Sequence, residues 1–229
     1  MARDIPRQIP LVLPHAPRFG AEDFLVTPAN AAAHAIVTSW PRWPDRSLLL
    51  VGAGGAGKSH LAEIWRAASG AEAAASAEDA IERLRGGADG AALLLDDVDR
   101  DGADENALFH LLNLARERAA RLLLTARQAP TLLWPTLPDL ASRLRALPVA
   151  RLEEPDDETV RAVLLKLLDD RQLKVEAGVI DYVARQCDRS LGAVRELVEA
   201  LDRESLARGR SIGRGLAGDV LHRLRGDDD

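Results

Sequence analysis

The stretch GAGGAGKS at residues 52–59 places small residues, a lysine and a hydroxyl in the spacing G-x-x-x-x-G-K-[ST]. Small residues allow backbone N–H groups to wrap a phosphate, and the N-terminus of a following helix adds positive potential. The lysine of this pattern reaches the terminal phosphates, and the hydroxyl ligates Mg²⁺. The residues predicted to bind a phosphate-bearing cofactor are Gly52, Gly54, Gly55, Ala56, Gly57, Lys58, Ser59 and His60.

Two other interpretations of this stretch remain open. The letters GAGGAG also fit G-x-G-x-x-G, the fingerprint of dinucleotide-binding proteins, and a glycine-rich stretch can be a purely structural turn. The pair Lys58-Ser59 favours a phosphate-binding loop (P-loop), because a dinucleotide-binding turn has no role for a lysine there.

A second chemical pattern is the run LLLDDVD at residues 93–99. An apolar strand that ends at Asp96 places a carboxylate beside Mg²⁺, and Asp97 is then placed to orient the attacking water. The metal-binding residues predicted from the two patterns are Ser59 and Asp96. The alternative is a buried strand followed by an acidic turn with no catalytic role. Asp97 is shorter than the glutamate that many P-loop ATPases carry, which predicts weak hydrolysis.

The elements that must position these residues alternate along the first two thirds of the chain. Apolar runs near residues 46–51, 91–95, 121–126 and 147–152 predict buried strands, and amphipathic segments between them predict helices. A helix is also predicted within 27–40. The pattern predicts an α/β fold with a parallel sheet flanked by helices. After residue 156 only helices are predicted, at 157–172, 176–187, 190–208 and about 214–225, which indicates a small all-α domain.

Composition excludes several classes of protein. The net charge of -6 argues against a stand-alone nucleic-acid binder, and the single cysteine, Cys187, excludes an internal disulfide. No signal peptide and no run of 18 apolar residues is present, so we expect a cytoplasmic protein with no membrane partner. The five histidines lack metal-binding spacing, and no G-x-S-x-G nucleophile motif occurs.

The order of motifs resembles that of the AAA+ ATPases. FLVTPAN, GAGKSHLAEIW, LLLDDVD, PDLASRLRALPVARL and LGAVRELVEALDR follow one another as in the replication initiator DnaA, and the chain looks most similar to the shortened, DnaA-related regulators of the Hda (HdaA) family. The resemblance covers about residues 8–225. It implies an AAA+ P-loop NTPase domain at 21–152, a helical lid domain at 153–229, and ADP or ATP with Mg²⁺ as cofactors.

The resemblance also implies roles for three further residues. Arg143 matches the arginine finger that reaches the nucleotide of a neighbouring subunit, and the alternative is a helix-surface arginine. Arg195 matches the sensor-2 arginine of the lid, and the alternative is a helical pair with Glu199. Thr125 lies at the sensor-1 region, but Ala126 and Arg127 follow it where relatives have Ser or Gly and then Asp. The resemblance thus assigns Arg143, Asp97 and Thr125 to catalysis, with slow intrinsic hydrolysis.

The segment at residues 1–20 contains four prolines within twelve positions, so it predicts an extended arm. Its stretch QIPLVL resembles the short motif with which Hda-type proteins bind the β sliding clamp of DNA polymerase III. Prolines lower the ordering entropy of such a segment, and its apolar side chains fill pockets. The predicted clamp-binding residues are Gln8, Ile9, Leu11, Val12 and Leu13; the alternative is an arm folded over the chain's own sheet.

Together these features predict an adaptor that binds the clamp and stimulates hydrolysis of the ATP held by DnaA, which limits re-initiation of replication. Contact with DNA is expected through the clamp, and self-association is a further expectation. The first alternative is a recruiter or loader that delivers a partner to DNA without stimulating hydrolysis. The second is a stand-alone ATPase.

Overall fold

The computed structural model describes residues 20–131 and 134–226. The chain divides into two compact units, with the boundary between Glu154 and Pro155. The first is an α/β unit and the second is helical, and each is described by itself.

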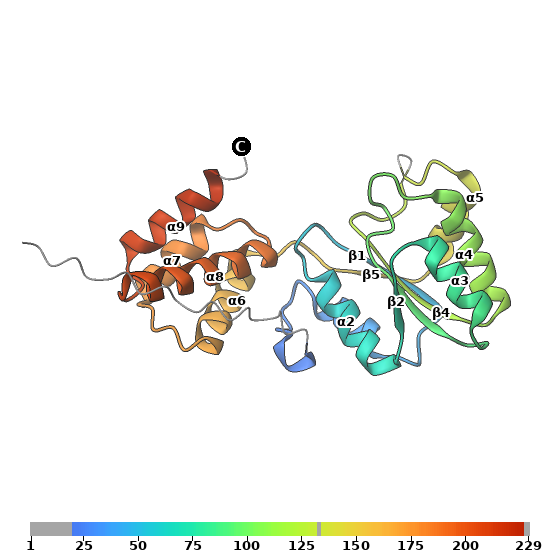
Figure 1. The fold of residues 1–229 in the computed structure, drawn as a ribbon, viewed down its shortest axis with the longest axis horizontal. Helices are drawn as coiled ribbons and strands as arrows, with labels where there is room; N and C mark the ends of the chain where they lie inside the picture. Colours follow the sequence, from blue (N-terminus) through green and yellow to red (C-terminus); the bar gives the residue numbers. More distant parts are fainter. Residues whose placement is uncertain (1–19, 132–133, 227–229) are drawn as a thin grey trace, which may run out of the picture. The chain divides into compact units, whose positions relative to one another are not determined.

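The α/β unit is built on a five-stranded parallel sheet (Figure 1). Its strands are paired in the order β2-β3-β4-β1-β5, and every printed pairing is parallel. Parallel sheets are covered on both faces, so their strands consist of continuous apolar runs, and all five residues of β1 are buried. The strands are β1 (Ser47–Val51), β2 (Glu72–Ala74), β3 (Ala92–Leu95), β4 (Arg121–Ala126) and β5 (Val149–Arg151).

Helices cover both faces of this sheet, with α2 on one side and α3, α4 and α5 on the other (Figure 1). Alternate residues of each strand point to opposite faces, so Leu48 and Leu50 pack with α1 and α2, while Leu49 packs with the other helices. The bounds are η1 (Ala21–Asp23), α1 (Ala31–Thr38), α2 (Lys58–Ser69), α3 (Ala77–Gly86), α4 (Glu105–Glu117) and α5 (Pro138–Ala146).

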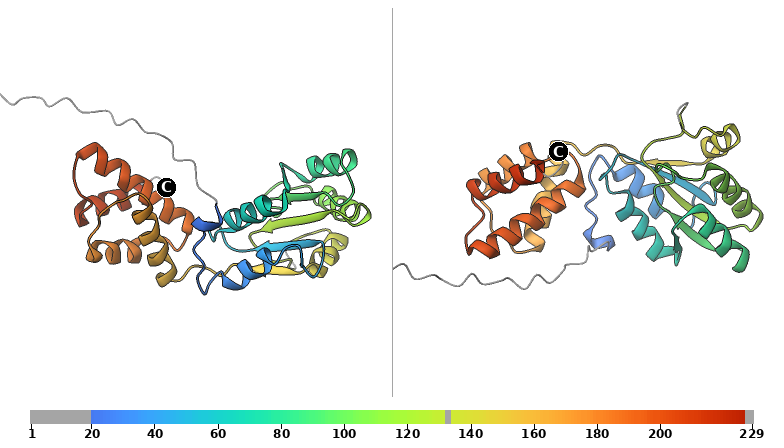
Figure 2. Two further views of the ribbon diagram at one scale, coloured as in Figure 1. Left: turned by 90° about the horizontal axis from the view of Figure 1, so that it is seen from below. Right: turned by 45° about the horizontal axis from the view of Figure 1, so that its top comes forward.

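In the described residues, the second unit has four helices, drawn in orange and red in Figure 2, and they pack around their own apolar core. Two of the helices begin with side-chain caps, because Asp156 accepts from Thr159 N at 2.7 Å and Ser190 accepts from Ala193 N at 3.3 Å. The helices are α6 (Asp157–Asp170), α7 (Ala177–Gln186), α8 (Leu191–Arg208) and α9 (Arg214–Gly226).

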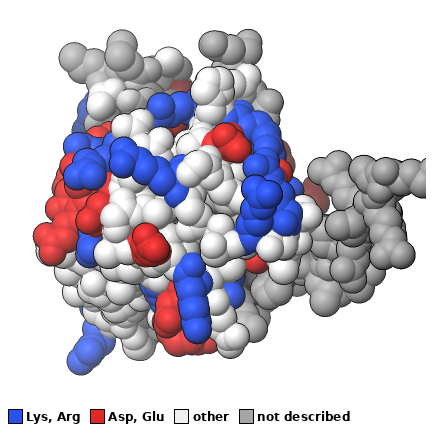
Figure 3. Space-filling model, turned by 90° about the vertical axis from the view of Figure 1, so that its left-hand side faces the viewer, with Lys and Arg blue, Asp and Glu red and all other residues white. Residues whose placement is uncertain are grey.

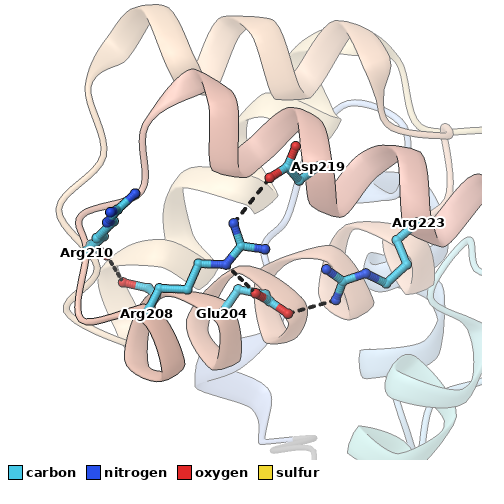
Figure 4. Close-up of polar contacts among 6 residues, drawn as sticks. Glu204, Arg208, Arg210, Asp219 and Arg223 are labelled. Atoms are coloured by element: carbon cyan, nitrogen blue, oxygen red, sulfur yellow. Dashed lines mark hydrogen bonds and ion pairs between the residues drawn. The ribbon is translucent and has the colours of Figure 1, made fainter. Parts of the chain in front are cut away.

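Charged side chains of both signs lie on the surface of the helical unit (Figure 3). Glu204 accepts from Arg208 Nε of the same helix α8 at 2.8 Å, and from Arg223 Nη1 of α9 at 2.7 Å (Figure 4). Arg208 also binds Asp219 at 3.2 Å. The pairs of Arg208 with Asp219 and of Glu204 with Arg223 join the end of α8 to α9.

The predicted fold class is confirmed, since the structure has a parallel sheet flanked by helices. The sequence analysis missed β2, which lies in the Ala-rich stretch before α3. The helix predicted within 27–40 is shorter, at Ala31–Thr38, because Asn30 Oδ1 accepts from Thr27 N at 2.9 Å and forms a turn before it. In the described ranges 20–131 and 134–226, no helix is long and apolar enough to cross a membrane.

Candidate functional site

The glycine-rich loop joins β1 to α2, as the P-loop prediction requires. Gly55 (φ 72°) and Gly57 (φ 100°) have left-handed backbone conformations, which disfavour residues with a Cβ. Lys58 is the first residue of α2 and is only 7% exposed. Its Nζ donates to Gly52 O at 2.9 Å and to Ala53 O at 3.2 Å. The lysine charge is therefore held against the loop, where a helix N-terminus attracts phosphate.

Close packing explains the first glycine of the loop. A Cβ at Gly52 would lie 2.9 Å from Leu152 Cβ and 3.1 Å from Leu152 O, whereas a Cβ at Gly54 would meet nothing within 4 Å. Leu152 directly follows β5, the neighbour of β1. The loop can lie this close to the end of β5 only with glycine at position 52.

The two predicted metal ligands lie side by side. Ser59 Oγ, in the first turn of α2, donates to Asp96 Oδ2 at 3.1 Å, directly after β3. Mg²⁺ is commonly held by one or two protein oxygens together with substrate phosphates and waters. In the described part of the chain, no cluster of three or more His, Cys, Asp or Glu could hold a metal. The residues present therefore fit a Mg²⁺ ion that a bound nucleotide helps to hold, beside a cavity of about 240 Å³ that Ser59 and Asp96 help to line.

Thr125 links β4 to the acidic turn. Its fully buried hydroxyl donates to Asp96 Oδ1 and accepts from Asp97 N at 2.8 Å. Val98 N also donates to Thr125 O at 2.8 Å, and Asp97 has φ 50°. The predicted catalytic residues Asp97 and Thr125 are therefore in contact, and Thr125 fixes the backbone that carries Asp97.

The sequence analysis gave Asp99 no role, but this residue binds the loop after β4. Its carboxylate accepts from Arg127 N at 2.9 Å and 2.8 Å, and from Gln128 N at 3.1 Å. The signal in the sequence that could have pointed to Asp99 is the position of an acidic residue shortly after a buried strand. Its partners are nearly thirty positions away along the chain, so no local pattern identifies them.

His60, predicted to bind the cofactor, contacts the segment before α1. Its Nε2 lies 3.1 Å from Gly20 O, and its ring packs edge-on against Phe24 at 5.2 Å between centroids. The structure thus gives His60 a packing role at the start of the described chain, and a role in cofactor binding stays a prediction.

Arg143 lies on the exposed surface of α5, whose opposite side is anchored by the fully buried Leu140 and Leu144. In the described part of the chain, no side chain or backbone group pairs with the Arg143 guanidinium. Arg145, two residues further, donates from Nη2 to Thr131 O at 3.4 Å. The two arginines of this helix therefore have different surroundings.

Glu105 fastens the start of α5 to the start of α4. Its carboxylate accepts from Thr136 N at 2.9 Å, from Thr136 Oγ1 at 2.9 Å and from Leu137 N at 2.7 Å. Burial raises the pKa of Glu105, but these hydrogen bonds outweigh it and hold the pKa below its usual value. Because Leu137 is the N-cap of α5, Glu105 helps to fix the helix that carries Arg143.

The remaining predicted residues belong to other parts of the chain than the α/β unit. Arg195 is a partly buried residue of α8, in the helical unit, and its possible partner Glu199 accepts from Arg171 Nη2 at 3.4 Å. The clamp-binding residues Gln8, Ile9, Leu11, Val12 and Leu13 lie outside the described residues.

Comparison of the sequence with known proteins identifies relatives of this chain. No family model matches the chain. It is 30% identical over 213 residues to the chromosomal replication initiator protein DnaA of Rippkaea orientalis, covering 82% of this chain and 46% of that protein. It is 27% identical over 216 residues to DnaA of Thermus thermophilus, covering 82% and 48%. The chain thus spans about half the length of the DnaA proteins that it matches.

Solved structures show the same fold. Domain III of DnaA from Thermotoga maritima superposes with a TM-score of 0.75 at 22% identity, covering 92% of this chain and 98% of that one. AMPPCP-bound DnaA from Aquifex aeolicus superposes with a TM-score of 0.65 at 22% identity, covering 85% and 69%. The parallel sheet, the P-loop between β1 and α2 and the acidic turn after β3 are thus those of an AAA+ domain. In sequence and in fold, the chain is a DnaA-like AAA+ P-loop protein whose counterpart in DnaA is domain III.

Proposed function

We propose that the chain is a regulator of the Hda type, which binds ADP or ATP with Mg²⁺ and stimulates hydrolysis of the ATP held by DnaA. The nucleotide part is supported by the contacts of Lys58, Ser59 and Asp96. It is also supported by the AMPPCP bound to the DnaA structure of the same fold. In this proposal residues 52–60 bind the nucleotide, Ser59 and Asp96 hold Mg²⁺, and Arg195 of the lid acts as sensor 2.

The observation that carries the regulatory part is the exposed Arg143, which has no partner among the described residues and lies on a helix fixed by Glu105 and two buried leucines. A guanidinium placed against the phosphates of another molecule stabilises the charge of the transition state. An arginine supplied in this way accelerates hydrolysis by about 10³–10⁵ in GTPase systems. We expect a smaller effect here. The chain acts on the ATP of DnaA by supplying this side chain.

The chain's own hydrolysis is proposed to be slow. Asp97 has a short side chain, and Arg127 stands in the loop after Thr125 where an acidic residue is usual in relatives. Thr125 and Asp97 nevertheless remain the residues of this chain that are placed to act on a bound ATP, since their contact fixes the acidic turn.

The clamp part of the proposal rests on the sequence of residues 8–13. This motif tethers the chain to the β sliding clamp, and through the clamp to DNA, so that hydrolysis by DnaA follows clamp loading and limits re-initiation. The protein works in the cytoplasm, and assembly with further copies of itself belongs to the same proposal.

An assay of ATP turnover by DnaA, with clamp loaded on DNA, tests this function. Addition of the chain is expected to raise turnover, and deletion of residues 1–13 is expected to abolish the increase with an unchanged melting temperature. Recruitment of DnaA without faster turnover would favour the recruiter or loader. Turnover that persists without DnaA would favour a stand-alone ATPase.

A further inference from the structure

We propose that the helical unit contacts the phosphate backbone of duplex DNA directly, through a basic corner formed by Lys174, Arg210 and Arg214. Lys174 lies in the loop between α6 and α7, Arg210 lies in the loop between α8 and α9, and Arg214 is the first residue of α9. The choice of DNA as the ligand rests on the proposed function, which brings the chain to a clamp loaded on DNA. The position of the three cations comes from the structure alone.

The two loops that carry the basic corner lie side by side. Val175 and Ile212 form a parallel bridge, and Ile212 is only 4% exposed, so it anchors its loop in the core of the helical unit. Lys174 is next to Val175, and Arg210 and Arg214 are each two residues from Ile212. Because an extended chain spans at most about 3.6 Å per residue, the Cα atoms of both arginines lie within about 7 Å of the Ile212 Cα. The bridge therefore brings together three cations from two distant parts of the sequence.

Two hydrogen bonds fix the backbone of Arg210 at the end of α8. Its N–H donates to Ser205 O at 3.2 Å, and its carbonyl accepts from Ser205 Oγ at 2.7 Å. Gly209 ends the helix in a left-handed conformation, with φ 58°. The side chain of Arg210 is exposed and lies apart from the ion pairs of Glu204 (Figure 4). The turn is thus held in place while the guanidinium stays at the surface.

The cations of the basic corner can accept an anion without breaking an existing ion pair. Within residues 20–131 and 134–226, the side chains of Lys174 and Arg210 have no hydrogen-bond or ion-pair partner. Arg214 Cζ lies 4.6 Å from the centroid of the Tyr182 ring. Stacking on an aromatic ring orients a guanidinium and leaves the N–H groups at its edge able to donate.

Acidic residues are scarce around the basic corner. Residues 205–218 contain three arginines and no Asp or Glu. One of these arginines, Arg208, is engaged by two carboxylates of the helical unit. The acidic residue nearest to Lys174 in the sequence is Glu176. Positive charge is therefore in excess at this corner, although the whole chain carries a net charge of -6.

An open group of exposed cations fits a polyanion better than a single small anion. One ion pair at an exposed position contributes little, because water and salt screen it. A DNA duplex presents its phosphates in a continuous row, and it releases condensed counterions when cations bind, so several weak contacts add up. Contacts to the phosphates position a protein without reading the sequence. The basic corner therefore fits duplex DNA of any sequence.

The proposed tether to the clamp makes a weak contact sufficient. Three cations on a chain of net negative charge predict a Kd of about 10⁻⁴ M or weaker at physiological salt, at the weak end of non-specific DNA binding. A short flexible tether raises the effective concentration of a linked site to about the millimolar range. At that concentration the basic corner holds the helical unit on the DNA beside the clamp.

Binding of the full chain to a labelled duplex of random sequence, without clamp, DnaA or nucleotide, tests the proposal. Three phosphate contacts predict a slope of about -2.7 for the logarithm of the association constant against that of the salt concentration. A rise from about 50 to about 200 mM salt should then weaken binding by about 40-fold. Lys174→Ala combined with Arg210→Ala should change the slope to about -1 and weaken binding at low salt by at least about 10-fold.

Two further variants separate charge from structure. Lys174→Arg combined with Arg210→Lys keeps both charges and should bind DNA as the parent does. Arg185→Ala removes an exposed arginine from the last turn of α7, at the other end of the helix that follows Lys174, and should leave the slope unchanged. Melting temperatures should equal that of the parent in all variants, because none of these side chains has a described partner to lose.

The proposal is overturned if the parent does not bind the duplex at low salt, or if the double alanine variant keeps the salt slope of the parent. It is also overturned if the parent binds vesicles that contain phosphatidylglycerol through the same residues but does not bind DNA. Failure of the proposed function has a different signature, because the chain would then bind the duplex but would not raise ATP turnover by DnaA.

Discussion

Three charged side chains of the α/β unit, Lys58, Asp99 and Glu105, bind backbone groups, whereas the charged side chains at the end of α8 and on α9 bind one another. Lys58 contacts two carbonyls of its own glycine loop, and Asp99 and Glu105 each contact two backbone N–H groups of loops that are distant in the sequence. Glu204 instead pairs with the exposed side chains of Arg208 and Arg223 (Figure 4).

This difference has a physical consequence. A hydrogen bond to a backbone group fixes the path of a loop, and a buried group left without it costs about 1–3 kcal/mol. An ion pair between long exposed side chains is worth about 0–1 kcal/mol and is screened by salt. The hydrogen bonds of Lys58, Asp99 and Glu105 therefore fix the geometry of loops, whereas the ion pairs between α8 and α9 only join two helices.

The largest effect is expected for Lys58→Ala, which removes the lysine charge from the phosphate loop. Affinity for ADP should fall on the order of 100-fold or more, since a charged contact to phosphate is lost in a nearly buried position. Titration with labelled ADP measures it, and thermal unfolding without nucleotide checks that the variant folds. Unchanged affinity in a folded variant would remove the P-loop assignment.

Thr125→Val tests the hydroxyl that connects β4 to the acidic turn. Valine keeps the shape of the side chain but removes the contacts to Asp96 and Asp97 N, so the free energy of unfolding should fall by about 1–3 kcal/mol. Chemical denaturation gives this value. The matched control is Thr38→Val, because the exposed Thr38 hydroxyl donates only to His34 O, within its own helix. Equal losses in the two variants would contradict the comparison.

The glycines of the loop allow a test of packing. Gly52→Ala should destabilise the chain by about 1–3 kcal/mol, because its Cβ would overlap Leu152, and Gly54→Ala should be close to neutral. Melting temperatures of the two alanine variants measure the difference. A tolerated alanine at position 52 would show that β5 can move away from the loop.

The smallest effects on stability are expected for substitutions of Glu105 and Glu204, and these two residues are expected to differ in their dependence on salt. Hydrogen bonds to Arg223 and Arg208 lower the pKa of Glu204 below its ordinary 4.5, and hydrogen bonds to Thr136 and Leu137 outweigh burial to lower that of Glu105. A lowered folded-state pKa stabilises the fold above the unfolded value, and this stability is lost as the pH falls through about 4.5 and below.

Glu204→Gln should cost about 0.2–1 kcal/mol at pH 7 in low salt and less in 1 M salt. Glu105→Gln should cost about 1–2 kcal/mol with little dependence on salt, because its partners are uncharged. Denaturation curves at pH 7 and pH 3, in low and high salt, measure both. A loss at Glu105 that disappears in high salt would contradict this account.

The P-loop and the acidic turn could be predicted because their signals are local. Glycines, Lys58 and Ser59 lie within eight positions, and the buried strands before Gly52 and Asp96 are continuous apolar runs. The strand β2 could not be predicted, because Glu and Ala have low β propensity. Its extended form comes from pairing with β3, where Ala73 lies opposite Leu94.

The long-range contacts that assemble the site could not be predicted from the sequence alone either. Asp99 binds backbone N–H groups, which every residue except proline carries, so the side chains of its partners do not reveal the contact. Glu105 resembles an ordinary acidic residue at a helix start, and only the tertiary structure brings it to Leu137. Contacts of this kind depend on strand order.

The central claim is that Arg143 acts on the nucleotide of another protein, and Arg143→Ala tests it. This variant should fold, bind ADP and bind clamp as the parent does, because the described structure gives its guanidinium no partner to lose. Arg145→Ala is the control on the same helix. The measurement is the rate of ATP hydrolysis by DnaA with clamp on DNA. The account predicts that stimulation is lost with Arg143→Ala and kept with Arg145→Ala; stimulation by Arg143→Ala equal to that of the parent would contradict it.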